Sequence, residues 1–271
     1  MMTKPMQPVQ PTQPTPPTQP EQPALDPWAE LRRHTPARIA LGRSGTALPT
    51  AEVLAFAAAH AQARDAVHVA LDVAALQADL RAQGWEALTV SSRADGRAEF
   101  LRRPDLGRRL VAADAQRLEA LAAAPADLAV VLADGLSAVA VQRHGLPLLL
   151  DLRQALGESL RWAPVVIATQ ARVALADEVG GLLQARAVLV LIGERPGLSS
   201  PDSLGAYLTF APTLGRLDAQ RNCVSNIRPA GLVTGAAAGR IAWLLREALR
   251  RRLSGVALKD ESEVGLIAPP G

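Results

Sequence analysis

The chain has 271 residues, of which 49% are hydrophobic, 20% are charged and 3% are aromatic. A chain of that length and composition can bury a full core, which excludes a wholly disordered protein and a small disulfide-stapled one. Its 29 basic and 26 acidic residues leave a net charge of +3. Because the basic residues are spread along the sequence, we do not expect nucleic acid as a partner.

Cysteine content and hydropathy exclude further classes of protein. Cys223 is the single cysteine, so the chain has no internal disulfide and no cysteine cluster for structural zinc. Its apolar runs are shorter than the roughly 18 residues that span a bilayer. The first residues also lack the charged and apolar regions of a secretory signal. We therefore expect a cytoplasmic protein without a membrane partner.

The first part of the chain divides into a tail and a small region. Residues 1–26 repeat a Thr-Gln-Pro rhythm, which predicts a disordered Pro/Gln-rich tail. Residues 27–103 are expected to form a small N-terminal region of helices plus a hairpin. Helical spacing predicts its helices at residues 29–33, 50 to about 63, and about 66 to 83.

The expected hairpin follows these helices. Leu88, Val90 and Ser92 alternate with other residues up to a turn at residues 94–96, and residues 98–101 could return as a second strand. Alternation on both sides of an Asp-Gly turn is typical of a β-hairpin.

Residues 104–271 repeat strand and helix patterns. Short apolar runs predict strands, and longer periodic segments between them predict helices, at residues 107–123, 137–160 with an interruption at Pro147, and 174–184. The long helix of residues 232–253 should end on Ser254 and Gly255. The strands are expected at residues 128–132, 165–169, 187–192, 206–210 and 222–227. This order predicts an α/β fold, with a Rossmann-like, mostly parallel sheet flanked by helices.

Ligands of open α/β sheets lie beyond the carboxyl ends of the strands. Polar or glycine-rich segments follow three of the expected strands, at residues 134–137, 170–173 and 193–200. In the third, glycines allow backbone approach to a ligand, and Glu194 and Arg195 bring opposite charges. Two interpretations remain open: a binding site, or a tight turn whose charged residues pair with neighbours.

Familiar catalytic patterns are missing from these segments. They contain no P-loop lysine and no G-x-G-x-x-G fingerprint, so nucleotide chemistry has no support from motifs. The serines lie outside a G-x-S-x-G elbow, and no histidine can be assigned as their base. Cys223 lies within an expected strand and is interpreted as a buried packing residue. The residues therefore indicate a ligand platform without its own reacting groups.

Two longer motifs carry a family resemblance. The stretch LIGERPGLSSPDSLGAYLTF at residues 191–210 and the stretch RNCVSNI at residues 221–227 resemble the small (light) subunit of ethanolamine ammonia-lyase. Shorter matches occur in the same order at residues 103–109, 133–137 and 172–173. The resemblance covers about residues 27–256.

The resemblance implies a subunit of an adenosylcobalamin-dependent carbon–nitrogen lyase, which converts ethanolamine to acetaldehyde and ammonia by radical chemistry. It also implies a hetero-oligomer with equal numbers of large and small subunits, in which a TIM-barrel large subunit carries the catalytic residues. The family's cobalamin contacts fall on Val173, Glu194 and Cys223, and this chain is expected to supply no catalytic residue and no metal ligand. Arg172 and Arg195 are weaker candidates, for the nucleotide phosphate.

Two alternatives to this assignment remain, an autonomous nucleotide-binding α/β enzyme and a non-catalytic assembly protein. Localisation also has two readings. Several relatives carry an N-terminal amphipathic helix that directs packing into a bacterial microcompartment, which a Pro/Gln-rich tail cannot form. A free cytoplasmic enzyme is therefore expected, with encapsulation as the alternative.

Overall fold

The computed structural model describes residues 28–35, 37–121 and 124–262. Its internal contacts divide the chain into two units, Met1–Pro49 and Thr50–Gly271. The expected Pro/Gln-rich tail lies outside the described residues. In the first unit, helix α1 (Ala29–Arg33) forms where the sequence predicts it. None of the helices in the described ranges is long and apolar enough to cross a membrane.

The second unit is built on a six-stranded sheet with the order β1-β3-β2-β4-β5-β6. Strands β1 to β4 are parallel to one another, β5 is antiparallel to β4, and β6 is antiparallel to β5. The α/β fold with a mostly parallel sheet is thereby confirmed. The strands span β1 (Ala87–Ser91), β2 (Ala126–Ala133), β3 (Val165–Thr169), β4 (Ala185–Gly193), β5 (Leu204–Phe210) and β6 (Arg221–Ile227).

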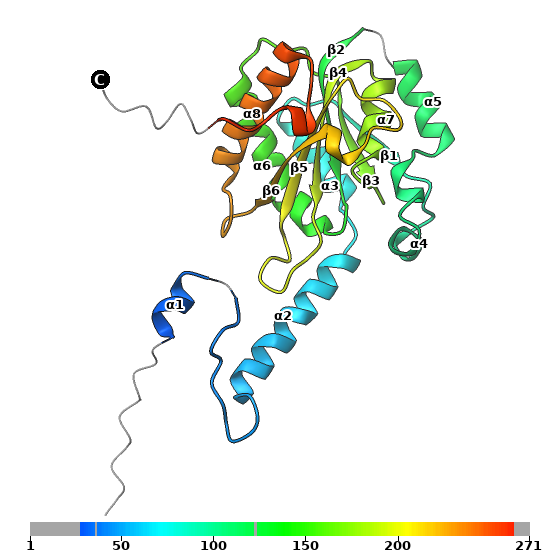
Figure 1. Ribbon diagram of the computed structural model, residues 1–271. Coiled ribbons are helices and arrows are strands. Elements are labelled where there is room, and N and C mark those ends of the chain that lie inside the picture. The colour runs from blue at the N-terminus through cyan, green and yellow to red at the C-terminus, as the bar shows by residue number, and fades with distance from the viewer. Residues whose placement is uncertain (1–27, 36, 122–123, 263–271) are drawn as a thin grey trace, which may run out of the picture. The chain divides into compact units, whose positions relative to one another are not determined.

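Helices cover both faces of this sheet (Figure 1). Helices α6 (Ala138–Leu156) and α8 (Thr234–Arg251) lie on one face, and α5 (Ala112–Leu121) and α7 (Leu175–Leu182) lie on the other. Two-sided burial explains why β2 to β4 are continuous apolar runs rather than alternating ones.

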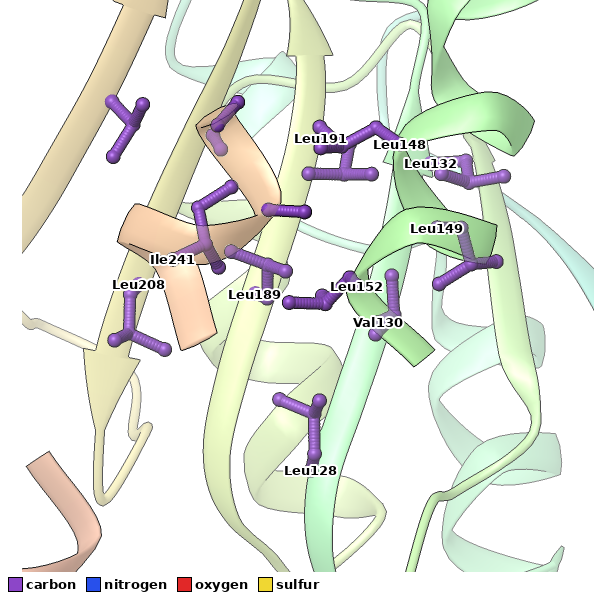
Figure 2. Packing of buried hydrophobic residues seen from close by; sticks show 14 of the residues in the cluster. Leu128, Val130, Leu132, Leu148, Leu149, Leu152, Leu189, Leu191, Leu208 and Ile241 are labelled. Atoms are coloured by element: carbon purple, nitrogen blue, oxygen red, sulfur yellow. The ribbon is translucent and has the colours of Figure 1, made fainter. Parts of the chain in front are cut away.

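The larger hydrophobic cluster lies between the sheet and α6 and α8 (Figure 2). Leu128, Val130 and Leu132 of β2 point to this side, whereas Val131 and Ala133 point to the side of α5 and α7. This alternation is the period of two that a strand requires. It places every side chain of β2 from Leu128 onward in one of the two cores.

The helices before the sheet differ from their predicted bounds. Helix α2 spans Thr50–His68 and α3 spans Val73–Ala82, so the predicted start of the second helix near residue 66 is wrong. The alanine-rich sequence continues α2 because alanine strongly favours helix. The second helix begins only after Asp72, whose carboxylate accepts a hydrogen bond from the Ala75 amide at 2.9 Å as an N-cap.

The predicted β-hairpin is wrong. Strand β1 pairs in parallel with β3, and the expected return strand is helix α4 (Arg97–Arg102). The Glu99 side chain accepts a hydrogen bond from the Asp95 amide at 2.7 Å, and Phe100 is fully buried. These contacts stabilise a helical turn. Strand β1 instead pairs with β3, which lies more than 70 residues later in the chain.

Three further features of the helices differ from prediction. Helix α6 runs through Pro147 without the expected interruption, and a short 3₁₀ turn, Leu106–Arg108, precedes α5. Helix α8 ends at Arg251, with Arg252 in the left-handed conformation, instead of reaching Ser254 and Gly255. Buried residues on both sides of the proline, such as Val141 before it and Leu148 after it, hold α6 together despite the one backbone donor that proline lacks.

The domain division after residue 103 stays a prediction. Strand β1, which precedes that division, is the edge strand of the same sheet.

Candidate functional site

A pocket of about 410 Å³ lies at the carboxyl ends of the parallel strands. The helix after β2 packs on one face of the sheet and the helix after β3 packs on the other, and such a change of side is where open α/β sheets bind ligands. All three polar strand ends singled out in the sequence contribute to the pocket. Its lining residues are Gly135, Leu136, Arg172, Val173, Ile192, Gly193, Glu194, Arg195 and Tyr207.

Two glycines let the strand ends interlock beneath the pocket. Gly135 has a φ of +55°, and a Cβ there would lie 2.3 Å from the Gly193 carbonyl oxygen. A Cβ on Gly193 would lie 2.0 Å from the Ser137 carbonyl oxygen. The Leu136 amide donates to the Gly193 carbonyl at 2.9 Å, which joins the end of β2 to the end of β4. Only glycine permits so close an approach.

A buried carboxylate connects the ends of β2 and β3. Asp134 is 3% exposed, and its carboxylate accepts hydrogen bonds from the amides of Gln170 at 2.8 Å and Ala171 at 3.0 Å. Burial raises the pKa of Asp134, against the opposing effect of these amides and of Arg97. These bonds hold the backbone that leads directly into Arg172 and Val173.

Glu194 is oriented by contacts on one of its two oxygens. Its Oε2 accepts hydrogen bonds from the Ser203 hydroxyl at 2.6 Å and from the backbone N–H of Asn226 at 3.2 Å. A Cβ on Gly205 would lie 2.9 Å from Oε1, so the absence of a side chain there leaves room for this carboxylate. Glu194 is thus held by a hydroxyl and a backbone N–H group and not by a cation. This argues against the alternative that the segment is a tight turn whose charged residues pair with neighbours.

Of the three residues that the resemblance assigns to cobalamin, two line the pocket and one does not. Val173 and Glu194 both line the pocket, whereas Cys223 does not. Cys223 lies on β6 directly across from Tyr207, which does line the pocket. Val173 and Glu194 therefore share one pocket, and Cys223 lies beside it, with Tyr207 between the cysteine and the pocket.

The interpretation of Cys223 as a buried packing residue is wrong, because the side chain is exposed. The next residue of β6, Val224, packs in the cluster with α8, so Cys223 faces the other side of the sheet. On that side β6 has no covering helix of its own in the described chain. Desolvation by neighbouring protein atoms raises the pKa of the thiol, and the negative charge of Glu194 adds to this effect. A raised pKa disfavours the thiolate, so Cys223 is suited to packing against a ligand more than to nucleophilic attack.

Tyr207 is the pocket residue that sequence reasoning missed. It is the single tyrosine of the chain. It lies two residues after Gly205 on β5, so the two residues face the same side of the sheet, and this spacing was the signal that the sequence offered. Burial raises the pKa of Tyr207, with smaller contributions from Cys223 and Glu194. The phenol therefore stays protonated and can offer an aromatic face and a hydroxyl to a ligand.

The polar groups near the pocket do not form a reacting set. The Ser137 hydroxyl donates to the Pro201 carbonyl at 2.8 Å, and the buried His144 lies 3.4 Å from the Asp202 carboxylate. Across the described ranges, no group of three or more His, Cys, Asp or Glu residues could hold a metal ion. The pocket can bind a ligand, orient it and exclude water from one side of it. Its lining in the described chain holds no nucleophile paired with a base.

Comparison with known proteins gives a consistent family. Residues 25–259 match the sequence profile of the family described as ethanolamine ammonia-lyase light chain (EutC). A protein of Azotobacter vinelandii named ethanolamine ammonia-lyase small subunit is 58% identical over 250 residues, which cover 91% of this chain and 93% of that protein. Proteins with the same name from Xanthomonas campestris pv. campestris and Ralstonia nicotianae are 58% and 56% identical, over 89% of this chain and 90% and 91% of their own lengths.

Proposed function

The chain belongs to the ethanolamine ammonia-lyase light-chain family, and from this premise we propose that it forms one wall of an adenosylcobalamin site. The reaction of the assembled enzyme would be the conversion of ethanolamine to acetaldehyde and ammonia. The observation that carries the proposal is the grouping of Val173 and Glu194 in one pocket, with Cys223 beside its Tyr207 wall.

The chemistry of the pocket fits a corrin. A corrin is a broad, largely apolar plate whose rim carries amide groups, so it needs an apolar surface and a few oriented polar partners. Val173, Ile192 and Leu136 offer the apolar surface, and Glu194 is placed to accept hydrogen bonds from rim amides. When bound, adenosylcobalamin supplies the radical chemistry of the reaction. The residues of this chain would orient it and keep water away from one side.

A pocket of about 410 Å³ encloses only part of so large a cofactor, so a second protein must close the site. The name small subunit, shared by the relatives, implies a large subunit. We propose that a TIM-barrel large subunit binds in equal number and carries the catalytic residues. A permanent association should bury well over ~1,000 Å².

Glu194→Ala tests this function in the complex co-expressed with its large subunit. Because the variant removes a held acceptor, we expect the Kd for adenosylcobalamin to rise about tenfold, corresponding to roughly 1.4 kcal/mol. The Kd is measured by titration of the visible absorbance of the cofactor, and acetaldehyde formation is followed with and without cofactor. Glu158→Ala, at an exposed position outside the pocket, is the matched control and should leave the Kd unchanged.

The two alternatives give different results in the same experiments. An autonomous enzyme would turn over a nucleotide substrate as an isolated chain, without the large subunit. An assembly protein would copurify with the large subunit, yet Glu194→Ala would leave cofactor affinity unchanged. Either result would overturn the proposed role of the pocket.

A further inference from the structure

The rim of the pocket carries two arginines that form no ion pair within the described chain. Arg172 and Arg195 both line the pocket, and Arg108 is close enough to affect the charge of Arg172. Elsewhere in the described ranges many arginines are paired with carboxylates, as Arg109 is with Glu178 at 3.1 Å and Arg186 with Asp127 at 3.0 Å. Within those same ranges neither Arg172 nor Arg195 forms an ion pair, and Arg108 forms none either.

Arg172 is held in one position by its surroundings. Its guanidinium lies 4.1 Å from the centre of the Phe100 ring, and its Nη2 donates to the Phe100 carbonyl at 3.1 Å. Its backbone amide donates to the Gly107 carbonyl at 2.8 Å. A Cβ on Gly107 would lie 2.9 Å from the Arg172 Cγ, so the absence of a side chain at Gly107 makes room for the arginine stem. Such an arginine loses little conformational freedom when it binds an anion.

The nearest carboxylates are already engaged by other groups. Asp134 accepts two backbone amides and lies 3.8 Å from Arg97, and Glu194 accepts the Ser203 hydroxyl and the Asn226 amide. The buried Nε of Arg172 has no hydrogen-bond partner within the described chain. Desolvation lowers the pKa of Arg172, and repulsion from Arg97, Arg195 and Arg108 adds to this, against the opposing attraction of Asp134. A bound anion would relieve that repulsion.

We propose that Arg172 and Arg195 form an anion subsite that takes the phosphate group of the cobamide nucleotide loop. The identity of this anion rests on the proposed function, since that phosphate is the one anionic group at the periphery of the cofactor. Arginine suits it because the planar guanidinium presents several donors in a fork that matches phosphate oxygens. The subsite would orient the nucleotide end of the cofactor while the apolar part of the pocket receives the corrin.

Two probes that differ in the phosphate alone test the subsite. Adenosylcobinamide phosphate and adenosylcobinamide are titrated against the complex with the large subunit, and each Kd is measured by absorbance. We expect the wild-type complex to prefer the phosphate form at least tenfold. Arg195→Gln and Arg172→Gln should each reduce this preference severalfold, and the Kd for adenosylcobinamide itself should change little. Because Arg195 is exposed, its variant keeps the test valid if Arg172→Gln folds poorly.

Arg81→Gln, an exposed arginine of α3 outside the pocket, is the matched control and should keep the full preference. Equal wild-type affinity for the two probes would overturn the subsite and leave the proposed function standing. A wild-type complex that binds no corrinoid would overturn the proposed function itself. Loss of large-subunit binding in the arginine variants would mean that these residues pair with carboxylates of the partner, which also overturns the subsite.

Discussion

At the scale of single residues, the pocket depends on how Glu194 is held. Ser203 and the Asn226 amide engage Oε2, and Gly205 leaves room beside Oε1. One oxygen is thus used for positioning and the other remains for a ligand. The sequence singled out Glu194, whereas its three neighbours became visible only when β5 and β6 were placed beside the end of β4.

Ser203→Ala should release this carboxylate. Because the 2.6 Å hydrogen bond is lost, we expect a severalfold rise in the Kd for adenosylcobalamin and a loss of roughly 1 kcal/mol in stability. Absorbance titration and urea unfolding measure the two effects. Ser199→Ala, in the same loop but exposed, should change neither quantity. If both variants bind the cofactor alike, Ser203 does not position Glu194.

At the scale of elements, the site is made by three strand ends that touch through glycine. The carboxyl ends of β2, β3 and β4 carry the polar segments, as the strand and helix pattern predicted. The same pattern was wrong for α4, because a short segment that follows Asp-Gly fits a hairpin strand as well as a short helix. Burial of Phe100 and the parallel pairing of β1 with β3 decided between them.

Gly135→Ala should disturb the interlocked strand ends. The change adds a Cβ at a φ of +55° and at 2.3 Å from the Gly193 carbonyl, so we expect a loss of about 2 to 4 kcal/mol in the free energy of unfolding. Gly84→Ala is the matched control, since this glycine ends α3 with a φ of +79° but nothing lies within 4 Å of the added atom. Its cost should be only the roughly 1 kcal/mol of the left-handed conformation. Equal losses in urea unfolding would show that the close approach does not matter.

At the scale of the whole unit, the pocket and the ion pair of Asp127 lie at opposite edges of the sheet. The pocket is at the carboxyl ends of the parallel strands, while Asp127 is at the amino end of β2. Its carboxylate accepts the Arg161 amide at 3.0 Å and contacts the Arg186 guanidinium at 3.0 Å. The Arg161 amide is the main cause of a lowered pKa of Asp127, and Arg186 adds to it.

This separation predicts a pH dependence without a change in binding. A lowered folded-state pKa contributes stability above the ordinary value of 3.8, and that stability is lost as the pH falls through the folded pKa. Asp127→Asn should therefore be less stable than the wild type at pH 7, and the difference should shrink below about pH 4. Urea unfolding across pH measures this, with the exposed Asp79→Asn as control. A difference independent of pH, or weaker cofactor binding, would contradict it.

The α/β class, the strand runs of β2 to β6 and the family were determined by the sequence alone, because buried apolar runs and two long motifs are local signals. Tertiary structure alone decided the parallel partner of β1, the helix at α4, the exposure of Cys223 and the entry of Tyr207 into the pocket. Each of these depends on which segments distant in the chain become neighbours. Strand pairing and burial set that outcome, and local propensity does not contain it.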